Sequence, residues 1–263
     1  MDLGLRGKIA LVSASSKGLG RAIAEELAAE GANLVLCSRG EDALRQTAVS
    51  IRKSAGVTVV DVPADVSDGA GIERVTKTAL DKFGKVDILV TNSGGPPSGS
   101  FESFTPENWE KATRLLLMSA VGLSRAVLPG MKERGWGRIL NVTSIAVKQP
   151  IEGLMLSNSL RAAVTGFART LANEVARFNV TVNNILPGYT RTDRVEDLAR
   201  ATSEKTGTST AEAFAKWERE IPMGRLGDPR EFAALAAFLA SERASYITGS
   251  SIAVDGGWVR ALL

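Results

Sequence analysis

Short apolar runs alternate with amphipathic segments along the first half of the chain. The run KIALVS at 8–13 is typical of a buried strand, and the segment after the following turn places apolar residues at helical spacing as far as Gly31. The same alternation recurs, with strands predicted at 33–37, 57–62 and 87–92 and helices at 41–54 and 71–84. It predicts a parallel sheet covered by helices on both faces.

The second half continues this pattern. A long helix is predicted from about Pro106, where a Thr-Pro pair and Glu107 are typical of a helix start, to about Arg134. Further strands are predicted at 138–144, 180–186 and 250–257, and further helices from about Leu156 to Arg177 and at 228–241. We therefore expect an α/β fold with about seven strands.

Residues 190–220 depart from this alternation. The stretch is polar and rich in Thr, Glu and Arg, and it breaks the hydrophobic period. Long segments between a strand and a helix are often functional, so we expect an irregular insertion that acts as a lid over a site. Because 263 residues are ordinary for one α/β sheet with its helices, the whole chain, 1–263, is predicted to form a single domain.

Composition places the chain among globular proteins. Hydrophobic residues make up 44% of it and charged residues 23%, and no uninterrupted apolar run reaches the length of about 18 residues that spans a bilayer. The amino terminus has no signal-peptide pattern. The one cysteine, Cys37, lies in an apolar strand run and cannot form an internal disulfide, which is typical of a reducing compartment. We expect Cys37 in the core and the protein in the cytoplasm, without a membrane partner.

Charge and the absence of histidine exclude several function classes. The pI is near 9.1, but the net charge is only +3 and the basic residues are spread among acidic ones, so no nucleic-acid partner is expected. The chain has no histidine, which removes the Ser-His-Asp triad and the commonest ligand of transition metals, and no metal site is predicted. Proton transfer must then use a hydroxyl, an amine, a carboxylate or water.

A turn that contains glycines, SSKGLG at 15–20, lies between the first predicted strand and the first predicted helix. Glycines at this place let backbone N–H groups approach a pyrophosphate at the amino terminus of the helix. The chain has Ala14 where such a turn usually begins with glycine. An ordinary tight loop is the alternative, but strand, turn and helix together favour a dinucleotide site.

The end of the second strand bears on the choice of dinucleotide. Arg39 stands after Cys37 and Ser38, where an acidic residue would bind the free ribose hydroxyls of NAD(H). An arginine suits a 2′-phosphate, and Lys17 in the glycine turn adds a second cation. The alternative is that both are solvated surface residues. We predict NADP(H) as the preferred cofactor, with NAD(H) as the second choice.

Six motifs stand in order along nearly the whole chain. They are SASSKGLG at 13–20, ADV at 64–66, TNSGG at 91–95, NVTS at 141–144, LPG at 186–188 and TGSSIAVDGG at 248–257. With them the chain resembles the short-chain dehydrogenase/reductase family, most closely its 3-oxoacyl-acyl-carrier-protein reductase-like members. The resemblance implies a Rossmann-type doubly wound parallel sheet and a homotetramer. It also implies an NADP(H)-dependent interconversion of a small-molecule carbonyl compound and an alcohol.

The resemblance also implies a set of cofactor-binding positions. They cover the glycine turn, the end of the second strand, the adenine site, the chain after the fourth strand and the path of the nicotinamide. A helix cap at Asp65 and a simple strand exit at Pro187-Gly188 are the structural alternatives. The predicted cofactor-binding residues are Ser13, Ser15, Ser16, Lys17, Gly18, Leu19, Gly20, Ser38, Arg39, Asp65, Val66, Asn92, Gly94, Arg161, Pro187, Gly188 and Thr192.

The catalytic positions of the family are altered in this chain. The resemblance implies that Ser144 orients the carbonyl group, whereas the tyrosine position holds Ser157, the lysine position Arg161 and the asparagine position Leu116. An aliphatic hydroxyl is a much weaker acid than a phenol, whose pKa is about 10. Arg161 keeps a positive charge but does not donate a proton near neutrality. Ser144, Ser157 and Arg161 are the predicted catalytic residues, with altered proton delivery.

Three questions stay open from the sequence. Tyr189, beside the expected nicotinamide pocket, either replaces the acid or only packs the base of the lid. The lid cations meet an anionic substrate or carrier, or they form a solvated helical face. The chain is either a reductase or an NADP(H)-binding regulatory or redox-sensing protein without catalysis. The lid cations are Arg191, Arg194, Arg200 and Lys205.

Overall fold

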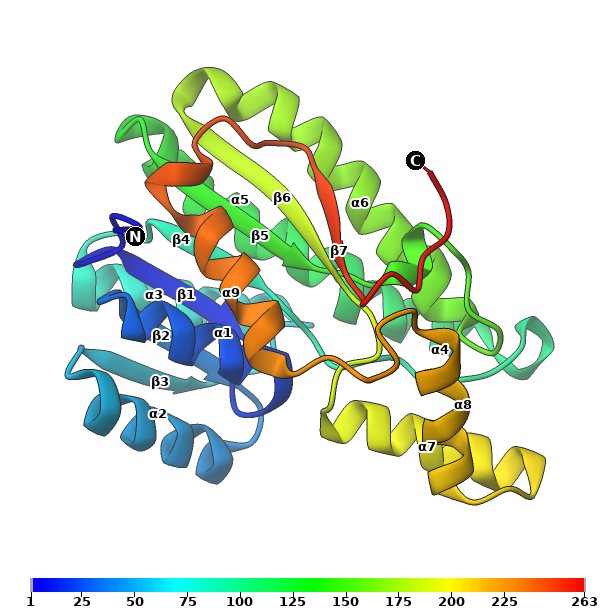
Figure 1. The fold of residues 1–263 in the computed structure, drawn as a ribbon. Helices are drawn as coiled ribbons and strands as arrows, with labels where there is room; N and C mark the ends of the chain where they lie inside the picture. Colours follow the sequence, from blue (N-terminus) through cyan, green and yellow to red (C-terminus); the bar gives the residue numbers. More distant parts are fainter. Residues whose placement is uncertain (1, 263) are drawn as a thin grey trace.

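The protein is built on a sheet of seven parallel strands, which confirms the prediction from the apolar runs. In the computed structural model, which describes residues 2–262, the strand order is β3-β2-β1-β4-β5-β6-β7 (Figure 1). The two ends of the predicted domain, 1 and 263, and the side chain of the predicted lid cation Lys205 lie outside the described residues. The strands are β1 Ile9–Ser13, β2 Asn33–Ser38, β3 Val59–Pro63, β4 Ile88–Thr91, β5 Gly137–Val142, β6 Val180–Pro187 and β7 Ser251–Val254.

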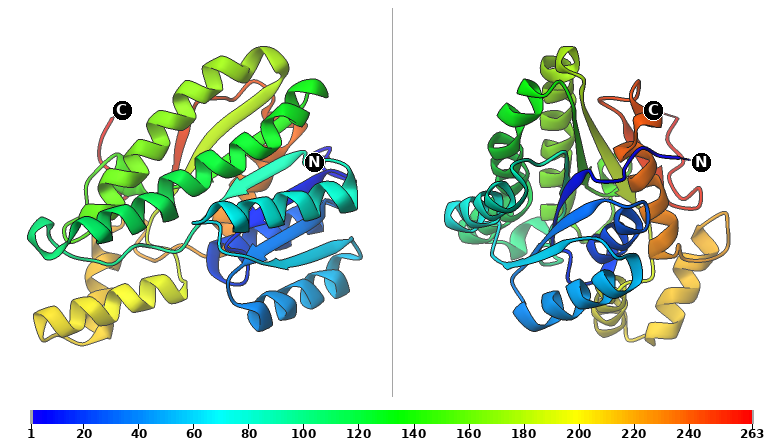
Figure 2. Two further views of the ribbon diagram at one scale, coloured as in Figure 1. Left: turned by 180° about the vertical axis from the view of Figure 1, so that it is seen from behind. Right: turned by 90° about the vertical axis from the view of Figure 1, so that its left-hand side faces the viewer.

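Helices cover both faces of the sheet, so the doubly wound α/β fold is confirmed. The helices are α1 Gly18–Ala29, α2 Glu41–Ala55, α3 Gly69–Phe83, α4 Pro106–Thr113, α5 Ser119–Glu133, α6 Met155–Val175, α7 Asp193–Thr206, α8 Thr210–Glu220 and α9 Pro229–Ala240. On one face lie α1, α2 and α9. On the other lie α3, α5 and α6, seen in front of the sheet in the left view of Figure 2. Short 3-10 turns occur at Phe101–Ser103, Ile145–Val147, Ala176–Phe178 and Glu242–Ala244.

The two layers of core follow from the alternation of side chains along buried strands. In β1, Ala10 and Val12 belong to the apolar cluster on the α1 and α9 face, whereas Leu11 belongs to the cluster on the α3 and α5 face. All three side chains are fully buried. Because burying a Val or Leu side chain contributes about 1.5–3 kcal/mol, apolar residues on both faces hold β1 at the centre of the sheet.

The long helix predicted from Pro106 is confirmed, with one difference. It begins with a capping box between Thr105 and Asn108, and it ends at Glu133. Between α4 and α5, the turn Arg114–Met118 is π-helical. Hydrophobic periodicity does not reveal such a turn, because the residues from Leu115 to Met118 are all apolar and show no stripe whose shift would mark an extra residue. Turns of this kind are frequent at functional sites.

The stretch Pro106–Glu133 is long and apolar enough to cross a bilayer, by length and composition alone. It contains no uninterrupted apolar run of that length, because charged residues such as Arg114 and Arg125 interrupt it. In the fold, its second half packs Leu123 and Val127 into the core cluster beside the sheet. A core helix meets the same criteria of length and composition, and 39% of the most apolar window of this helix is buried in the fold.

The prediction of an irregular segment at 190–220 is wrong. Two helices, α7 and α8, occupy it and pack against each other beyond the carboxyl ends of the strands, at the lower right of Figure 1. A capping box between Ser209 and Glu212 begins α8. The helical period is hard to recognise because few apolar side chains mark it. Together with Leu226, from the chain before α9, they form a small cluster of their own: Val195, Ala199, Ala213 and Trp217.

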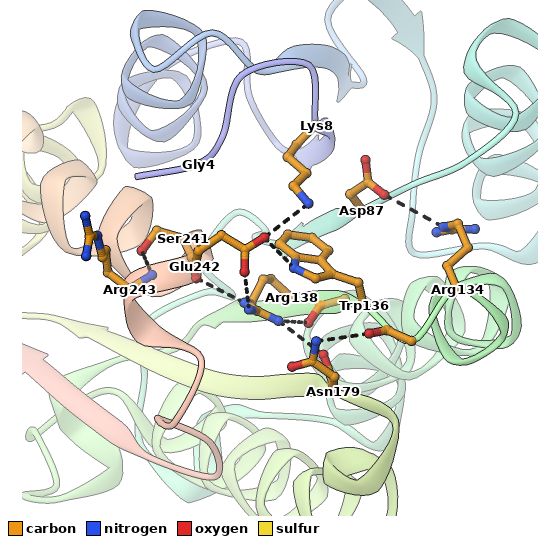
Figure 3. A network of polar contacts seen from close by, with 12 residues as sticks. Gly4, Lys8, Asp87, Arg134, Trp136, Arg138, Asn179, Ser241, Glu242 and Arg243 are labelled. Carbon is orange, nitrogen blue, oxygen red and sulfur yellow. Dashed lines mark hydrogen bonds and ion pairs between the residues drawn. The ribbon is translucent and has the colours of Figure 1, made fainter. Parts of the chain in front are cut away.

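A buried charge network holds the amino ends of the strands, opposite the carboxyl edge of the sheet (Figure 3). Arg138, at the start of β5, is fully buried and donates hydrogen bonds of 3.2 Å to the carbonyl oxygens of Ser241 and Asn179. Its guanidinium carbon lies 4.4 Å from the centre of the Trp136 ring. Glu242 accepts a hydrogen bond of 2.9 Å from the Trp136 indole and lies 3.9 Å from the Arg138 guanidinium. The network therefore joins β5 to the chain after α9.

We expect Arg138→Met to lower the free energy of unfolding by about 2–4 kcal/mol, because it leaves buried carbonyl oxygens without donors. The exposed Arg125 on α5 offers the matched control, and Arg125→Met should change the free energy by less than about 0.5 kcal/mol. Urea denaturation followed by circular dichroism measures both. Equal stability of the Arg138→Met protein and the unaltered protein would contradict a structural role for the network.

Candidate cofactor and active site

A cleft of about 590 Å³ opens at the carboxyl edge of the sheet. The strand order reverses between β1 and β4, since the chain runs outward from β1 to β3 on one side and from β4 to β7 on the other. Ligands of open parallel sheets bind at such a point, because the connections on its two sides leave in opposite directions. The glycine turn, the chain after β2, β4, β5 and β6, and the helices α6 and α7 supply the walls of the cleft.

The glycine turn has the shape that a pyrophosphate needs. Helix α1 begins at Gly18, and the side chain of Lys17 before it caps none of the first N–H groups. Gly18 has a left-handed φ of 57°. A Cβ atom on Gly20 would lie 2.3 Å from the Ala14 carbonyl oxygen, so only glycine fits there. Backbone donors at a helix amino terminus and a closely approached turn fit the phosphates of a dinucleotide.

Ala14 adopts a left-handed backbone conformation, which favours glycine. Its φ is 48°, a left-handed value that costs a non-glycine residue about 1–2 kcal/mol. Its carbonyl oxygen accepts a hydrogen bond of 3.3 Å from the Asn92 side chain. The Asn92 N–H donates to Ser13 Oγ at 2.9 Å, and Ser13 Oγ donates to the Asn92 carbonyl at 2.8 Å. These contacts tie the turn after β1 to the chain after β4.

The predicted cofactor residues separate into two groups. Ser13, Ser15 and Gly20 lie behind the wall of the cleft: Ser15 Oγ, for example, accepts a hydrogen bond of 3.0 Å from the Cys37 N–H. These residues stabilise the turn from behind. The sequence alone does not distinguish such buried residues from residues that line the cleft. The predicted cofactor residues that line the cleft are Ser16, Lys17, Gly18, Leu19, Ser38, Arg39, Asp65, Val66, Asn92, Gly94, Arg161, Pro187, Gly188 and Thr192.

The two cations expected at a 2′-phosphate have different partners. Arg39 lies 3.9 Å from Asp65, and its side chain stays 74% exposed. Lys17 donates a hydrogen bond of 2.8 Å to Asp193 at the start of α7. This bond raises the pKa of Lys17 and lowers the pKa of Asp193. Arg39 is therefore the more available cation at the end of β2, whereas Lys17 joins the glycine turn to α7.

All three predicted catalytic residues line the same cleft. Ser144 follows β5, and its Oγ accepts a hydrogen bond of 3.1 Å from the Ala146 N–H, which leaves the hydroxyl proton for another acceptor. Ser157 and Arg161 lie four residues apart on α6 and so share one face of the helix. The Arg161 guanidinium donates to the Val142 carbonyl oxygen at 2.9 Å. A hydroxyl donor and a fixed cation thus face one space, where they can stabilise a negatively charged oxygen.

A second guanidinium, that of Arg194 on α7, lies on the cleft wall. It donates a hydrogen bond of 3.0 Å to the Pro96 carbonyl oxygen. A Cβ atom on Gly95 would lie 2.6 Å from Arg194 Nε, so the side chain passes directly over this glycine. Burial lowers the pKa of both arginines, and the charge of Arg194 helps to lower the pKa of Arg161 to about 10. The two positive charges are therefore close enough to repel each other.

A much smaller cavity of about 10 Å³ adjoins the cleft at the π-helical turn. Leu116 from this turn lines it together with Asn92 and Arg161, which also line the large cleft. The volume is about that of a single water probe. Leu116 offers a water no hydrogen bond, because its side chain is apolar.

Tyr189 has the contacts of a packing residue. Its ring stacks on Trp217 with centroids 4.7 Å apart and meets Trp258 edge-on at 6.0 Å. Burial, and then the charge of Glu220, raises the pKa of Tyr189 to about 12. Because general acids work best when their pKa is near the working pH, these contacts favour a role in packing the base of α7 and α8 over a role as the acid.

Several residues of the cleft were not predicted from the sequence. Arg194 was expected only among the lid cations, and the apolar lining residues carry no motif. They come from separate elements: the π-helical turn, the loop before α6, and α7. No local pattern reveals residues that meet only through the fold. The apolar side chains of this group are Leu115, Ile151, Leu154 and Leu198.

Comparisons with known proteins agree along nearly the whole chain. A family model described as enoyl-(acyl carrier protein) reductase matches residues 13–259. A 3-oxoacyl-(acyl-carrier-protein) reductase of Vibrio cholerae is 38% identical over 255 residues, which cover 97% of this chain and 98% of that protein. A D-beta-hydroxybutyrate dehydrogenase of Cupriavidus necator is 38% identical over 262 residues, 97% of this chain and 99% of that protein. The structure of L-sorbose reductase from Gluconobacter frateurii, complexed with NADPH and L-sorbose, is 38% identical, with a TM-score of 0.95 and coverage of 100% of both chains.

The thiol of Cys37 offers a test of the cleft's buried wall. Burial, and then the charge of Asp65, raises the pKa of Cys37 to about 12. At pH 9 the folded protein therefore keeps a protonated thiol, whereas the unfolded chain is substantially ionised. We expect alkylation at pH 9 to be about 100-fold slower, or more, in the folded than in the urea-unfolded protein. Since Cys37 is the one cysteine of the chain, a thiol-reagent assay reports on it alone, and Cys37→Ser gives the blank. Equal rates would contradict a buried thiol.

Proposed function

The chain belongs to the short-chain dehydrogenase/reductase family of oxidoreductases, and we propose that it uses NADP(H) to interconvert a small-molecule carbonyl compound and its alcohol. One observation carries this proposal: the glycine turn with Arg39 and the pair Ser144 and Arg161 line one continuous cleft. A dinucleotide held at the first end can thereby reach a carbonyl group held at the second.

The residues at the cofactor end fit a dinucleotide with a 2′-phosphate. The amides at the start of α1 would hold the pyrophosphate, and the Arg39 guanidinium would bind the 2′-phosphate. Asp65 and Val66 would border the adenine, Asn92 would line the cofactor near β4, and Thr192 would lie along the nicotinamide. When bound, the cofactor supplies or accepts a hydride. The similar L-sorbose reductase is complexed with NADPH in its crystal structure, which supports this choice, and NAD(H) is the alternative.

The chain itself orients the carbonyl group and stabilises charge on its oxygen. Ser144 Oγ donates a hydrogen bond to the carbonyl oxygen, and the Arg161 guanidinium stabilises the alkoxide that forms there. The Arg161 guanidinium would also hold the ribose hydroxyls of the cofactor. Ser157 places a second hydroxyl on the same face of α6, through which a proton passes from water to the alkoxide oxygen. Without a phenol of matched pKa, general acid catalysis loses up to about 10²–10⁴ in rate.

The substrate is a small carbonyl compound or alcohol, and α7 and α8 act as a lid over it. The names of similar proteins support this class, since they act on 3-oxoacyl, hydroxybutyrate and sorbose compounds. The bond between Lys17 and Asp193 and that between Arg194 and Pro96 hold α7 across the cleft. We infer a homotetramer and a cytoplasmic location from the family resemblance and from the composition.

A second function is favoured by the changed catalytic positions. With Ser157, Arg161 and Leu116 at three of the four, the protein can bind NADP(H) as a regulatory or redox-sensing protein without turnover. Both functions use the cofactor end of the cleft. A measurement of turnover, and of its loss when Ser144 is replaced, distinguishes the enzyme from the binding protein.

Replacement of Arg39 tests the cofactor preference. We expect Arg39→Ala to reduce the preference for NADPH over NADH by about tenfold to a hundredfold, because charge-assisted bonds to the 2′-phosphate are lost. Arg45→Ala is the matched control, since Arg45 is an exposed arginine on the next helix that pairs with Glu41 at 2.6 Å. Fluorescence titration with both cofactors gives the two dissociation constants. A preference that Arg39→Ala leaves unchanged would argue that the phosphate is bound elsewhere.

Replacement of Ser144 tests catalysis. NADPH oxidation is measured with a panel of ketoacyl, diketone and sugar substrates. We expect turnover with at least one of them, and Ser144→Ala should lower kcat/KM by about 10²–10³ while leaving NADPH affinity unchanged. Ser159→Ala, at an exposed serine of α6, should change neither quantity. NADPH binding without any substrate-dependent oxidation would favour the regulatory function instead.

A further inference from the structure

Two positive charges in the cleft have no counter-ion in the part of the chain that the structure describes. Arg161 and Arg194 both line the cleft. Each makes one hydrogen bond, to the backbone carbonyl of Val142 and of Pro96 respectively, although a guanidinium has five N–H donors. Neither has a carboxylate within ion-pair distance among residues 2–262. Burial lowers the pKa of Arg194, and the charge of Asp197 offsets this only in part.

The acidic side chains that line the cleft are engaged elsewhere. Asp65 faces Arg39 at 3.9 Å, and Asp193 accepts the 2.8 Å hydrogen bond of Lys17. In the proposed function, Arg39 and the amino terminus of α1 would hold the phosphates of the cofactor, at the same end of the cleft as Asp65 and Lys17. Among the residues that the structure describes, Arg161 and Arg194 are therefore the cations of the cleft whose positive charges no neighbouring negative charge neutralises.

Arg194 is held in place for binding a planar anion. Its side chain lies directly over Gly95, and its Nη2 is fixed by the Pro96 carbonyl oxygen. The guanidinium thus keeps free N–H donors while losing little conformational entropy when an anion binds. A planar guanidinium matches the two oxygens of a carboxylate. The neighbouring lid cations differ, because Arg191 pairs with Glu218 at 3.3 Å and Arg200 pairs with Asp197.

The rest of this end of the cleft is apolar. Leu115, Ile151, Leu154 and Leu198 line it. Apolar walls exclude water, and a charge-assisted hydrogen bond is stronger where water is excluded. A compact aliphatic body beside an ionised group fits these walls better than a large, hydroxyl-rich one.

We propose that the substrate carries a carboxylate, which the Arg194 guanidinium binds, while Ser144 and Arg161 hold the carbonyl or alcohol oxygen. This inference rests on the proposed function and specifies its substrate as a short oxo acid or hydroxy acid. Two anionic groups are candidate ligands of Arg194: the carboxylate of the substrate and the pyrophosphate of the cofactor. We assign Arg194 to the substrate, since the glycine turn and the amino terminus of α1 would hold the pyrophosphate.

The test measures binding to the full-length protein saturated with NADP⁺. Isothermal titration uses acetoacetate and laevulinate as probes, and their uncharged methyl esters as matched compounds. We expect the dissociation constant of each acid to be lower than that of its ester by a factor of about ten or more. Arg194→Gln should weaken binding of the acids by about tenfold to a hundredfold, with little effect on the esters and on NADP⁺. Arg219→Gln removes an equal charge from an exposed position of the neighbouring helix α8 and should change none of these affinities.

Each contrary result overturns the substrate assignment. If Arg194→Gln weakens NADP⁺ binding as much as acid binding, Arg194 serves the pyrophosphate. If acids and esters bind alike, or if neither acid binds to protein that is saturated with NADP⁺, the site does not select carboxylates. Circular dichroism of the Arg194→Gln protein checks that the fold is kept. Failure of the proposed function shows itself differently, as an absence of NADP⁺ binding or of turnover with any carbonyl compound.

Discussion

The pairing of β1 with β4 is the constraint on which the rest of the structure depends. The register from Ala10 with Ile88 to Val12 with Val90 joins strands that are far apart in the sequence and makes them the centre of the sheet. Because the chain leaves this pair in opposite directions, its carboxyl edge cannot be covered by a crossover helix, and a cleft stays open there. The bonds between Ser13 and Asn92 then set the position of the glycine turn relative to the chain after β4.

The charges around the cleft divide its chemistry between two ends. At one end, Arg39 and the amino terminus of α1 suit the phosphates of a dinucleotide. At the other, Arg161 and Arg194 concentrate positive charge among apolar walls, where an oxyanion is stabilised more strongly than in water. In the proposed mechanism, Arg161 stabilises charge without donating a proton. The proposed enzyme therefore depends more on electrostatic stabilisation and positioning, and less on a matched general acid.

The sequence predicted the features that depend on neighbouring residues. The seven strands, the glycine turn and the place of Ser144 follow from local apolar runs and short motifs, and the residues predicted to be catalytic line one cleft. Helices α7 and α8 were missed because caps and a small separate cluster stabilise them, with few apolar residues to mark a period. The π-helical turn and the position of Arg194 over Gly95 depend on contacts between distant elements, for which one sequence carries no local signal.

Transfer of deuterium tests the central claim most directly. NADPH that carries deuterium as its transferable hydrogen is incubated with the protein and a panel of small carbonyl compounds, and the alcohols are examined by mass spectrometry. Hydride transfer within one cleft predicts one deuterium on the carbinol carbon of at least one product, with loss of most of this product in the Ser144→Ala protein. Tight binding of NADPH without deuterium in any alcohol would contradict the claim that this cleft is an active site.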